Sequence, residues 1–464
     1  MSYTVTAPAR TVVRPRTRAV RAERLDSGSW WLAALITSWF YCLPLGRYEF
    51  AGVASDFRIY DFLFIGFVLF TAGYLPRVHS LLRDRSKFFY WARLLVVVSI
   101  LSLAITAYNG GMSLLPAAII RTYRWTAYLI TPVYIAAIAR TPEKQRFLIK
   151  VLYGNIVLQA GLAFFQGLHL LPNLWPLYWQ RGYSSGGDFP VGTLALHHKH
   201  IGVVMMIGVA MSMTLIRSTR LLVGKAIFCA LLVVMVVVTI FAGIRTAWLG
   251  LLVFGVAYLF IHRARALPVV FTLALAGGGF WWVTHGFVDD PMQDKLNTRL
   301  VDRYQRFGIQ GITRDRAAIW AGDLPSAIAE QPYVLIIGSG FQGFTAVVAS
   351  KGAHNNYLQA WIELGILGLL IYLRFLSRVL RTLKEVAKKS TDRFQRAFAQ
   401  DMWALFIGIM ATMMFGETLW AQYSVFTLSG QIMAAMAIAA CPVTWLGAKP
   451  GGSEVDARAL RVRP

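Results

Sequence analysis

The chain has 464 residues, of which 57% are hydrophobic and 15% are charged. A soluble domain is roughly half apolar, so this composition excludes an ordinary soluble enzyme and predicts a membrane protein. The formal net charge of +24 would favour nucleic-acid binding in a soluble protein, and its meaning therefore depends on where the basic residues lie.

The first thirty residues combine a run of arginines with the start of an apolar stretch, which superficially resembles a signal peptide. No small-residue cleavage site follows in WWLAALITSWFYCLPLG. We therefore expect residues 1–29 to form a basic cytoplasmic arm that leads into a retained first helix.

Apolar segments recur along the rest of the chain with little between them. A spanning helix needs about 20 apolar residues, and this measure predicts an all-α polytopic membrane protein with about 12 transmembrane helices. The expected spans are 30–46, 59–75, 92–108, 114–139, 148–168, 197–216, 221–242, 246–262, 267–284, 355–373, 398–416 and 421–446.

The basic residues follow these expected spans in a regular way. When the N-terminal arm is placed in the cytoplasm, alternate loops and the tail at 447–464 carry clusters of Lys and Arg, whereas the short loops YNGGMS and FGETLWAQ on the other side carry none. The positive-inside rule then places both termini in the cytoplasm. Orientation and attraction to anionic membrane lipids account for most of the charge, so no nucleic-acid partner is needed.

Two of the expected outer loops are too long to be simple connectors. The first loop, 169–196, follows the fifth expected span within the segment 30–284. The second loop, 285–353, precedes the last three spans, at 354–446. In the second loop, apolar residues at helical spacing predict a helix in DKLNTRLVDRYQRFG and another in RDRAAIWAGDLPSAIAEQ, and the glycine-rich IIGSGFQGF leads back to the tenth span.

Ionisable residues in apolar segments are functional candidates because they are costly to insert. Arg121 and Arg124 lie three residues apart, on one helical face near the outer side. They could be structural, through snorkelling or an ion pair with a carboxylate, or they could form a fork for a doubly charged anion such as a diphosphate.

Two further arginines lie on the expected outer side. Arg245 occupies a turn where the positive-inside rule disfavours a basic residue, which favours a role beside an anionic lipid head. Arg316 lies in the large loop and could also be part of a solvated helix face.

A histidine cluster, LHHKHIG, opens the expected sixth span and contains His198, Lys199 and His200. Its spacing and the lack of an adjacent carboxylate favour anion contact or interface anchoring over a metal site.

The tenth span begins with His354 and Asn355. An asparagine at this position could simply cap the helix, and this alternative is about as strong as a catalytic role for the histidine. Glu363 lies deeper in the same span, where a carboxylate needs a partner. We expect an ion pair with Arg121 or Arg124.

The spacing His354, Asn355, nine residues, Gly365, two residues, Gly368 resembles the signature of the O-antigen ligase and Wzy-type polymerase superfamily. Other parts resemble that superfamily in the same order. GIRTAWLG places Arg245 at a family basic position, RAAIW places Arg316 at another, and QPYVLIIGSGFQGF is similar to the segment that follows. GTLALHHKHIG resembles an element opening a central span, although His200 stands at the usual asparagine position. The resemblance covers roughly residues 150–440.

The resemblance implies a GT-C-like membrane fold and a glycan transferase of the bacterial inner membrane. Such an enzyme moves a glycan from undecaprenyl diphosphate to an acceptor hydroxyl at the periplasmic face, and direct displacement would invert the anomeric carbon. His354 would be the general base, and Arg245, Arg316, Arg121 and Arg124 would bind the donor diphosphate without a metal or another cofactor. The candidates for further donor or acceptor contacts are Asn355, Lys199, His198 and His200.

Three functions remain open at this point. HHKHIG inclines us to an O-antigen or exopolysaccharide polymerase, whose acceptor is another glycan. A ligase would instead transfer the glycan to lipid A-core. A transporter or flippase for lipid-linked glycans would also use intramembrane arginines, but it would need no general base.

Overall fold

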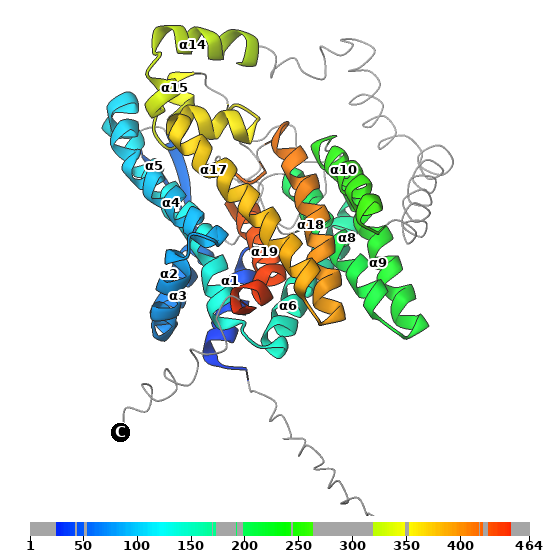
Figure 1. Cartoon of the computed structure of the whole chain (residues 1–464). Coiled ribbons are helices and arrows are strands. Elements are labelled where there is room, and N and C mark those ends of the chain that lie inside the picture. Colours follow the sequence, from blue (N-terminus) through cyan, green and yellow to red (C-terminus); the bar gives the residue numbers. More distant parts are fainter. Residues whose placement is uncertain are drawn as a thin grey trace, which may run out of the picture.

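The computed structural model describes residues 25–41, 44–50, 53–168, 170–172, 192, 198–242, 245–262, 319–348, 352–416, 418–420 and 426–446. These residues form a helical bundle (Figure 1). The expectation of an all-α fold needs one addition, because β1 and β2 form an antiparallel hairpin between the first two helices.

The first half of the chain runs through α1 (Ser27–Ser38), β1 (Pro44–Phe50), β2 (Val53–Arg58), α2 (Ile59–Phe70), η1 (Ala72–Tyr74), α3 (Leu75–Arg83), α4 (Phe88–Leu101), α5 (Leu103–Ile138) and α6 (Pro142–Gly167). The second half contains α8 (His198–Ser218), α9 (Leu222–Phe241), α10 (Arg245–His262), η4 (Ile319–Asp323), α14 (Leu324–Glu330), α15 (Val334–Ile337), α16 (Phe344–Val347), α17 (Asn356–Lys389), α18 (Arg393–Met413) and α19 (Phe426–Leu446).

Every expected span has a helix at its position except 267–284, which lies outside the described residues. Within the described part, five helices are long and apolar enough to cross a membrane, or six when the pair Ile59–Phe70 and Ala72–Arg83, bent by 61°, counts as one span. The structure therefore supports a membrane protein with several spanning helices. The full count of twelve spans stays a prediction.

Polar residues at the helix starts fix several of these boundaries. Asp26 accepts a hydrogen bond from the backbone of Ser29 at the start of α1, and Asp392 accepts one from Gln395 at the start of α18. Asn355 does the same for α17. Such caps satisfy amide groups that have no partner within the helix.

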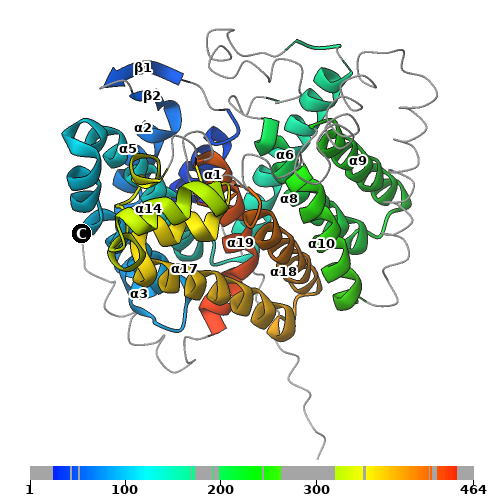
Figure 2. The same ribbon diagram turned by 90° about the horizontal axis from the view of Figure 1, so that it is seen from above.

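The helices α8 and α19 lie in the interior, and most of their described side chains are buried. Seen from above, α19 and α18 lie between the group formed by α2, α3, α5 and α17 and the group formed by α6 and α8 to α10 (Figure 2). Small residues let some helices approach closely. A Cβ on Gly408 of α18 would lie 2.5 Å from the carbonyl oxygen of Gly250 in α10, so these two backbones are in near contact.

The basic turns predicted to be cytoplasmic lie at one end of the bundle. The α8–α9 and α17–α18 turns lie at the lower end in Figure 1, whereas α14 and α15 lie at the upper end. A buried ion cluster lies near the ends of α8 and α10, where Asp401 of α18 accepts hydrogen bonds from Arg217 and Thr214 and contacts His262 at 3.1 Å. This arrangement agrees with the alternation of charge in the sequence.

Two parts of the expected large loop can be compared with the structure. The second predicted helix is present as η4 and α14, whereas the first, at 294–308, lies outside the described residues. The glycine-rich segment that follows leads back to α17 at the position of the tenth expected span, and it is buried from Gly338 to Phe344. Ser339, Phe341 and Phe344 are fully buried, so this part of the loop folds back into the bundle.

Candidate functional site

A segment of the large loop, Gly338–Gly343, inserts into a break in α17. At Gly365 the backbone of α17 leaves the helical conformation, which frees two carbonyl groups of the preceding turn. The backbone N–H of Ser339 donates to the oxygen of Ile362 at 2.7 Å, and that of Gly340 donates to the oxygen of Glu363 at 3.0 Å. The broken helix and the returning loop therefore satisfy each other's backbone groups.

Glycine is required at this contact for two reasons. Gly365 has φ of 67° and Gly338 has φ of 89°, values that L side chains rarely adopt. In addition, a Cβ on Gly365 would lie 2.1 Å from the oxygen of Ile336, and a Cβ on Gly338 would lie 2.4 Å from the oxygen of Glu363. These glycines thus allow the loop and the helix to touch backbone to backbone.

The other side of the same segment is held by the end of α4 and the start of α5. The backbone N–H of Phe341 donates to the Ser102 hydroxyl at 3.0 Å, and the Thr106 hydroxyl donates to the oxygen of Phe341 at 2.9 Å. The Asn109 side chain donates to the oxygen of Ser339 at 3.1 Å. The segment is therefore fixed between helices that are far apart in the sequence.

His354 lies in a short turn that is held on both sides. The carbonyl of Ala353 accepts a hydrogen bond from the Trp320 indole at 2.8 Å, and the Ala353 N–H donates to the Gln359 side chain at 3.1 Å. After the turn, the Asn355 side chain accepts hydrogen bonds from the backbone N–H groups of Tyr357 and Leu358, at 2.9 Å and 3.1 Å. Asn355 therefore caps α17, which is one of the roles the sequence allowed.

The conformation of His354 itself is unusual. Its φ is 49°, in the left-handed region that non-glycine residues seldom occupy. The residue is half-buried, so part of it is accessible. The neighbouring hydrogen bonds thus hold the backbone of His354 in a conformation that is rare for non-glycine residues and that clusters at functional sites.

Glu363 is fully buried about two helical turns into α17. Its carboxylate accepts hydrogen bonds from the Gln359 side chain and from the Trp420 indole, the latter at 2.9 Å, and it also receives the backbone N–H of Gln342. Gln359 and Trp420 thus supply side-chain hydrogen bonds where the sequence predicted an arginine ion pair.

The two candidate arginines of α5 have different partners. Arg124 donates from two nitrogens to the buried carboxylate of Asp61, at 2.9 Å and 2.7 Å, which is the structural alternative for this residue. Arg121, also buried, donates to the side-chain oxygen of Gln342 at 3.0 Å. The charge of Arg121 acts on Glu363 through space. The predicted ion pair between Arg124 and Glu363 is therefore wrong. Arg121 is connected to Glu363 through Gln342 instead.

These contacts connect the histidine turn to Arg121 through a chain of buried polar groups. The order is the Ala353 N–H, the Gln359 side chain, the Glu363 carboxylate, Gln342 and the Arg121 guanidinium. Sequence reasoning missed the two glutamines and Trp420. Gln359 could have been noticed because it lies four residues before Glu363, the spacing at which helical side chains meet, but Trp420 carries no local signal.

The other candidate residues are placed less completely. Arg245 begins α10, and His198 and Lys199 begin α8, but their side chains, like all of Arg316, lie outside the described part of the structure. His200 is buried on α8. Among the residues that the structure describes, no three His, Cys, Asp or Glu side chains gather in a way that could hold a metal ion.

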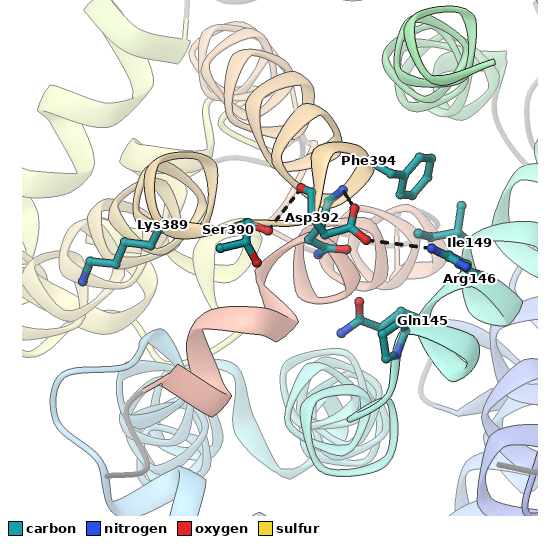
Figure 3. A pocket seen from close by; sticks show the side chains of 10 residues that line it. Gln145, Arg146, Ile149, Lys389, Ser390, Asp392 and Phe394 are labelled. Carbon is teal, nitrogen blue, oxygen red and sulfur yellow. Dashed lines mark hydrogen bonds and ion pairs between the residues drawn. The ribbon is translucent and has the colours of Figure 1, made fainter. Parts of the chain in front are cut away.

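A cavity of about 230 Å³ lies at the opposite end of the bundle, between the start of α6 and the α17–α18 turn. Figure 3 shows Arg146 reaching towards Asp392 across it, with an N–O distance of 3.8 Å, while Lys389 points away. The length of α17 separates this cavity from His354. It is therefore a feature of the basic end and not part of the site around Glu363.

Comparison with known proteins places a family domain over part of this site. Residues 230–373 match the family model described as O-antigen ligase. The match includes Arg245, Arg316, His354 and Glu363, and it agrees with the superfamily that the sequence motifs resemble. No curated protein matches the chain.

Proposed function

Because residues 230–373 carry an O-antigen ligase domain, we propose that this chain is a glycan transferase of the bacterial inner membrane, with a GT-C-like fold. Its donor is a glycan on undecaprenyl diphosphate, and its acceptor is a hydroxyl group at the periplasmic face. The observation that carries the proposal is the braced His354 turn, linked through buried polar groups to Arg121. This end of the bundle is opposite to the basic turns, which supports its assignment to the periplasmic side.

The chemistry needs one proton acceptor and one site for negative charge. His354 removes the proton from the acceptor hydroxyl while the hydroxyl oxygen attacks the anomeric carbon of the donor. The bond from this carbon to the diphosphate oxygen breaks, the electron pair leaves with undecaprenyl diphosphate, and the configuration at the carbon inverts. Imidazole suits the first role because its unperturbed pKa lies near neutral pH.

Arginines stabilise the departing diphosphate in this proposal, without a metal ion or another cofactor. Arg245, Arg316 and Arg121 form the diphosphate clamp, because guanidinium groups bind phosphate oxygens in pairs. Arg124 is left out of the clamp because two of its nitrogens already serve Asp61. The candidates for sugar contacts are Asn355, Lys199, His198 and His200.

The acceptor divides the proposal into two versions. We favour an O-antigen or exopolysaccharide polymerase, on the strength of the HHKHIG element, and the ligase version would use lipid A-core instead. Purified chain in lipid nanodiscs, given one donor and either a second lipid-linked glycan or lipid A-core, separates the two. The acceptor whose mass increases by one transferred glycan is then the one the enzyme uses.

The residue assignments are tested by single substitutions in the same assay, after treatment with EDTA. We expect His354→Ala to lower kcat by about 10² to 10⁴, the usual contribution of a general base, with unchanged membrane insertion. Arg245→Ala and Arg316→Ala should raise the donor KM and lower kcat. Full activity of His354→Ala would remove the base assignment, and a strict need for a divalent ion would remove the metal-free clamp.

Asp401→Asn is the matched control for these variants. Asp401 is as buried as Glu363 but belongs to the ion cluster near the other end of the bundle. The Asp401→Asn protein should melt at a lower temperature, while each folded molecule keeps its transfer rate.

A further inference from the structure

We propose that Glu363 is a positioning residue for the transfer reaction, which fixes the His354 turn and the Arg121 guanidinium relative to each other. The inference rests on the proposed function, because it presumes that these two groups act on the acceptor and the donor. Glu363 contacts neither substrate in this proposal. It acts through Gln359 on one side and through Gln342 on the other.

Glu363 meets hydrogen-bond donors on both of its carboxylate oxygens. The Gln359 side chain uses its oxygen to accept from the Ala353 N–H, so it can only donate from its nitrogen to the next group. The Trp420 indole can also only donate, and it donates to Oε2 of Glu363 at 2.9 Å, whereas Gln359 donates to Oε1. A buried group that meets both donors must be an acceptor on both sides, which a carboxylate is and an amide is not.

Glu363 also holds the returning loop at the break in α17. The carbonyl oxygens of Ile362 and Glu363 receive the N–H groups of Ser339 and Gly340, and the Glu363 side chain receives the N–H of Gln342. Backbone and side chain of the same residue thus bind the returning loop. Gln342, whose φ of 66° is also left-handed, then accepts from Arg121 at 3.0 Å through its side-chain oxygen.

Packed aromatic side chains fix the indole that binds Glu363. Trp420 packs between Trp125, Phe341 and Tyr372, with ring centroids 5.1 Å, 5.7 Å and 5.1 Å away. All of these residues are fully buried or nearly so. These packed rings hold the Trp420 indole in place, and the indole fixes the Glu363 carboxylate. The hydrogen bonds of the carboxylate then fix Gln359 on one side and Gln342 on the other.

The chain offers a specific test through an exchange of two side chains. Gln359 and Trp420 each donate to a different oxygen of Glu363. In Glu363→Gln, one of these oxygens becomes an NH₂ group, which then faces another donor and forms no hydrogen bond with it. The double variant Gln359→Glu with Glu363→Gln restores a consistent order. The carboxylate introduced at position 359 would accept from the Ala353 N–H and from the new amide at position 363, whose oxygen would accept from Trp420 and, with its second lone pair, from the Gln342 N–H. The single variant should break the alignment, and the double variant should rebuild it.

We expect Glu363→Gln to lower kcat by about 10²-fold, the cost of a displacement of about 1 Å at a reacting group. The donor and acceptor KM values should change far less, because binding contacts are kept. The double variant should recover at least about tenfold of the lost kcat, which makes the two substitutions strongly non-additive. Asp401→Asn, which removes another buried carboxylate, should leave kcat unchanged.

Three outcomes overturn the inference. Glu363→Gln could show normal kcat, the exchange could show no rescue although the protein folds, or Asp401→Asn could lower kcat as much as Glu363→Gln does. The failure of the proposed function is distinguishable: it appears as full transfer by His354→Ala or as no transfer by the unaltered chain. If His354→Ala is inactive and Glu363→Gln is normal, only the inference fails.

Discussion

Gly365→Ala should separate the returning loop from α17. The new Cβ would lie 2.1 Å from the Ile336 oxygen, where ordinary contacts begin near 3.4 Å, so the two atoms must move apart by about 1.3 Å. Gly365 has φ of 67° and ψ of −173°, a combination that is essentially restricted to glycine and costs an L-residue roughly 1–3 kcal/mol. If the loop undocks, the two backbone hydrogen bonds from Ser339 and Gly340 are lost, at about 0.5–1.5 kcal/mol each. The expected loss of stability is roughly 2–6 kcal/mol.

The assay compares Gly365→Ala with Gly161→Ala, a matched control in α6 where a Cβ meets nothing within 4 Å. We expect the control to melt at or slightly above the temperature of the unaltered chain, because alanine is the better helix former. Gly365→Ala should melt several degrees lower, and limited proteolysis should cut near Gly338 before the helices open. Equal melting temperatures and equal proteolysis of the two variants would refute this reasoning.

Two further predictions concern the basic end. Asp401→Asn leaves the largely buried Arg217 without its carboxylate, and we expect a loss of about 3 kcal/mol, seen as a lower apparent melting temperature; an unchanged melt would contradict the role of this cluster. For Asp26, burial would raise the pKa, but hydrogen bonds from Lys144, Ser29 and Tyr74 outweigh it and hold the pKa well below its usual value. Its stabilisation is therefore complete above the unfolded pKa of about 3.9 and is lost as the pH falls towards the folded pKa. The difference in melting temperature between the unaltered chain and Asp26→Asn should shrink as the pH is lowered from about 6 to about 3, and a constant difference would argue against the ionic contact.

Much of the helical architecture could be predicted from the sequence because membrane spans leave a simple physical signal. Long apolar runs such as 221–242 and 148–168 correspond to α9 and α6, and the basic turns lie at one end as the charge pattern required. The cap at Asn355 was also predictable, because asparagine at a helix start has a known role.

The details of the site could not be predicted because they depend on contacts between distant segments. Asp61 and Arg124 are 63 residues apart in the chain, so their pairing is visible only in the fold. The entry of Gly338–Gly343 into the bundle was missed for a similar reason. Its glycines carry no sequence signal for this contact, and only the break at Gly365 explains why they must be small. The hairpin of β1 and β2 was missed because it lies in the short segment between two apolar runs, and its first residues were counted as part of the expected span 30–46.

In the proposed function, this chain breaks the bond between a glycan and undecaprenyl diphosphate. The most direct measurement is the amount of free undecaprenyl diphosphate released by the purified chain in vesicles, compared with the number of new glycosidic bonds. We predict equal amounts of the two products, both formed at least about 10²-fold more slowly with His354→Ala. Movement of the intact lipid-linked glycan across the vesicle membrane, with no release of undecaprenyl diphosphate, would contradict the account and identify a flippase instead.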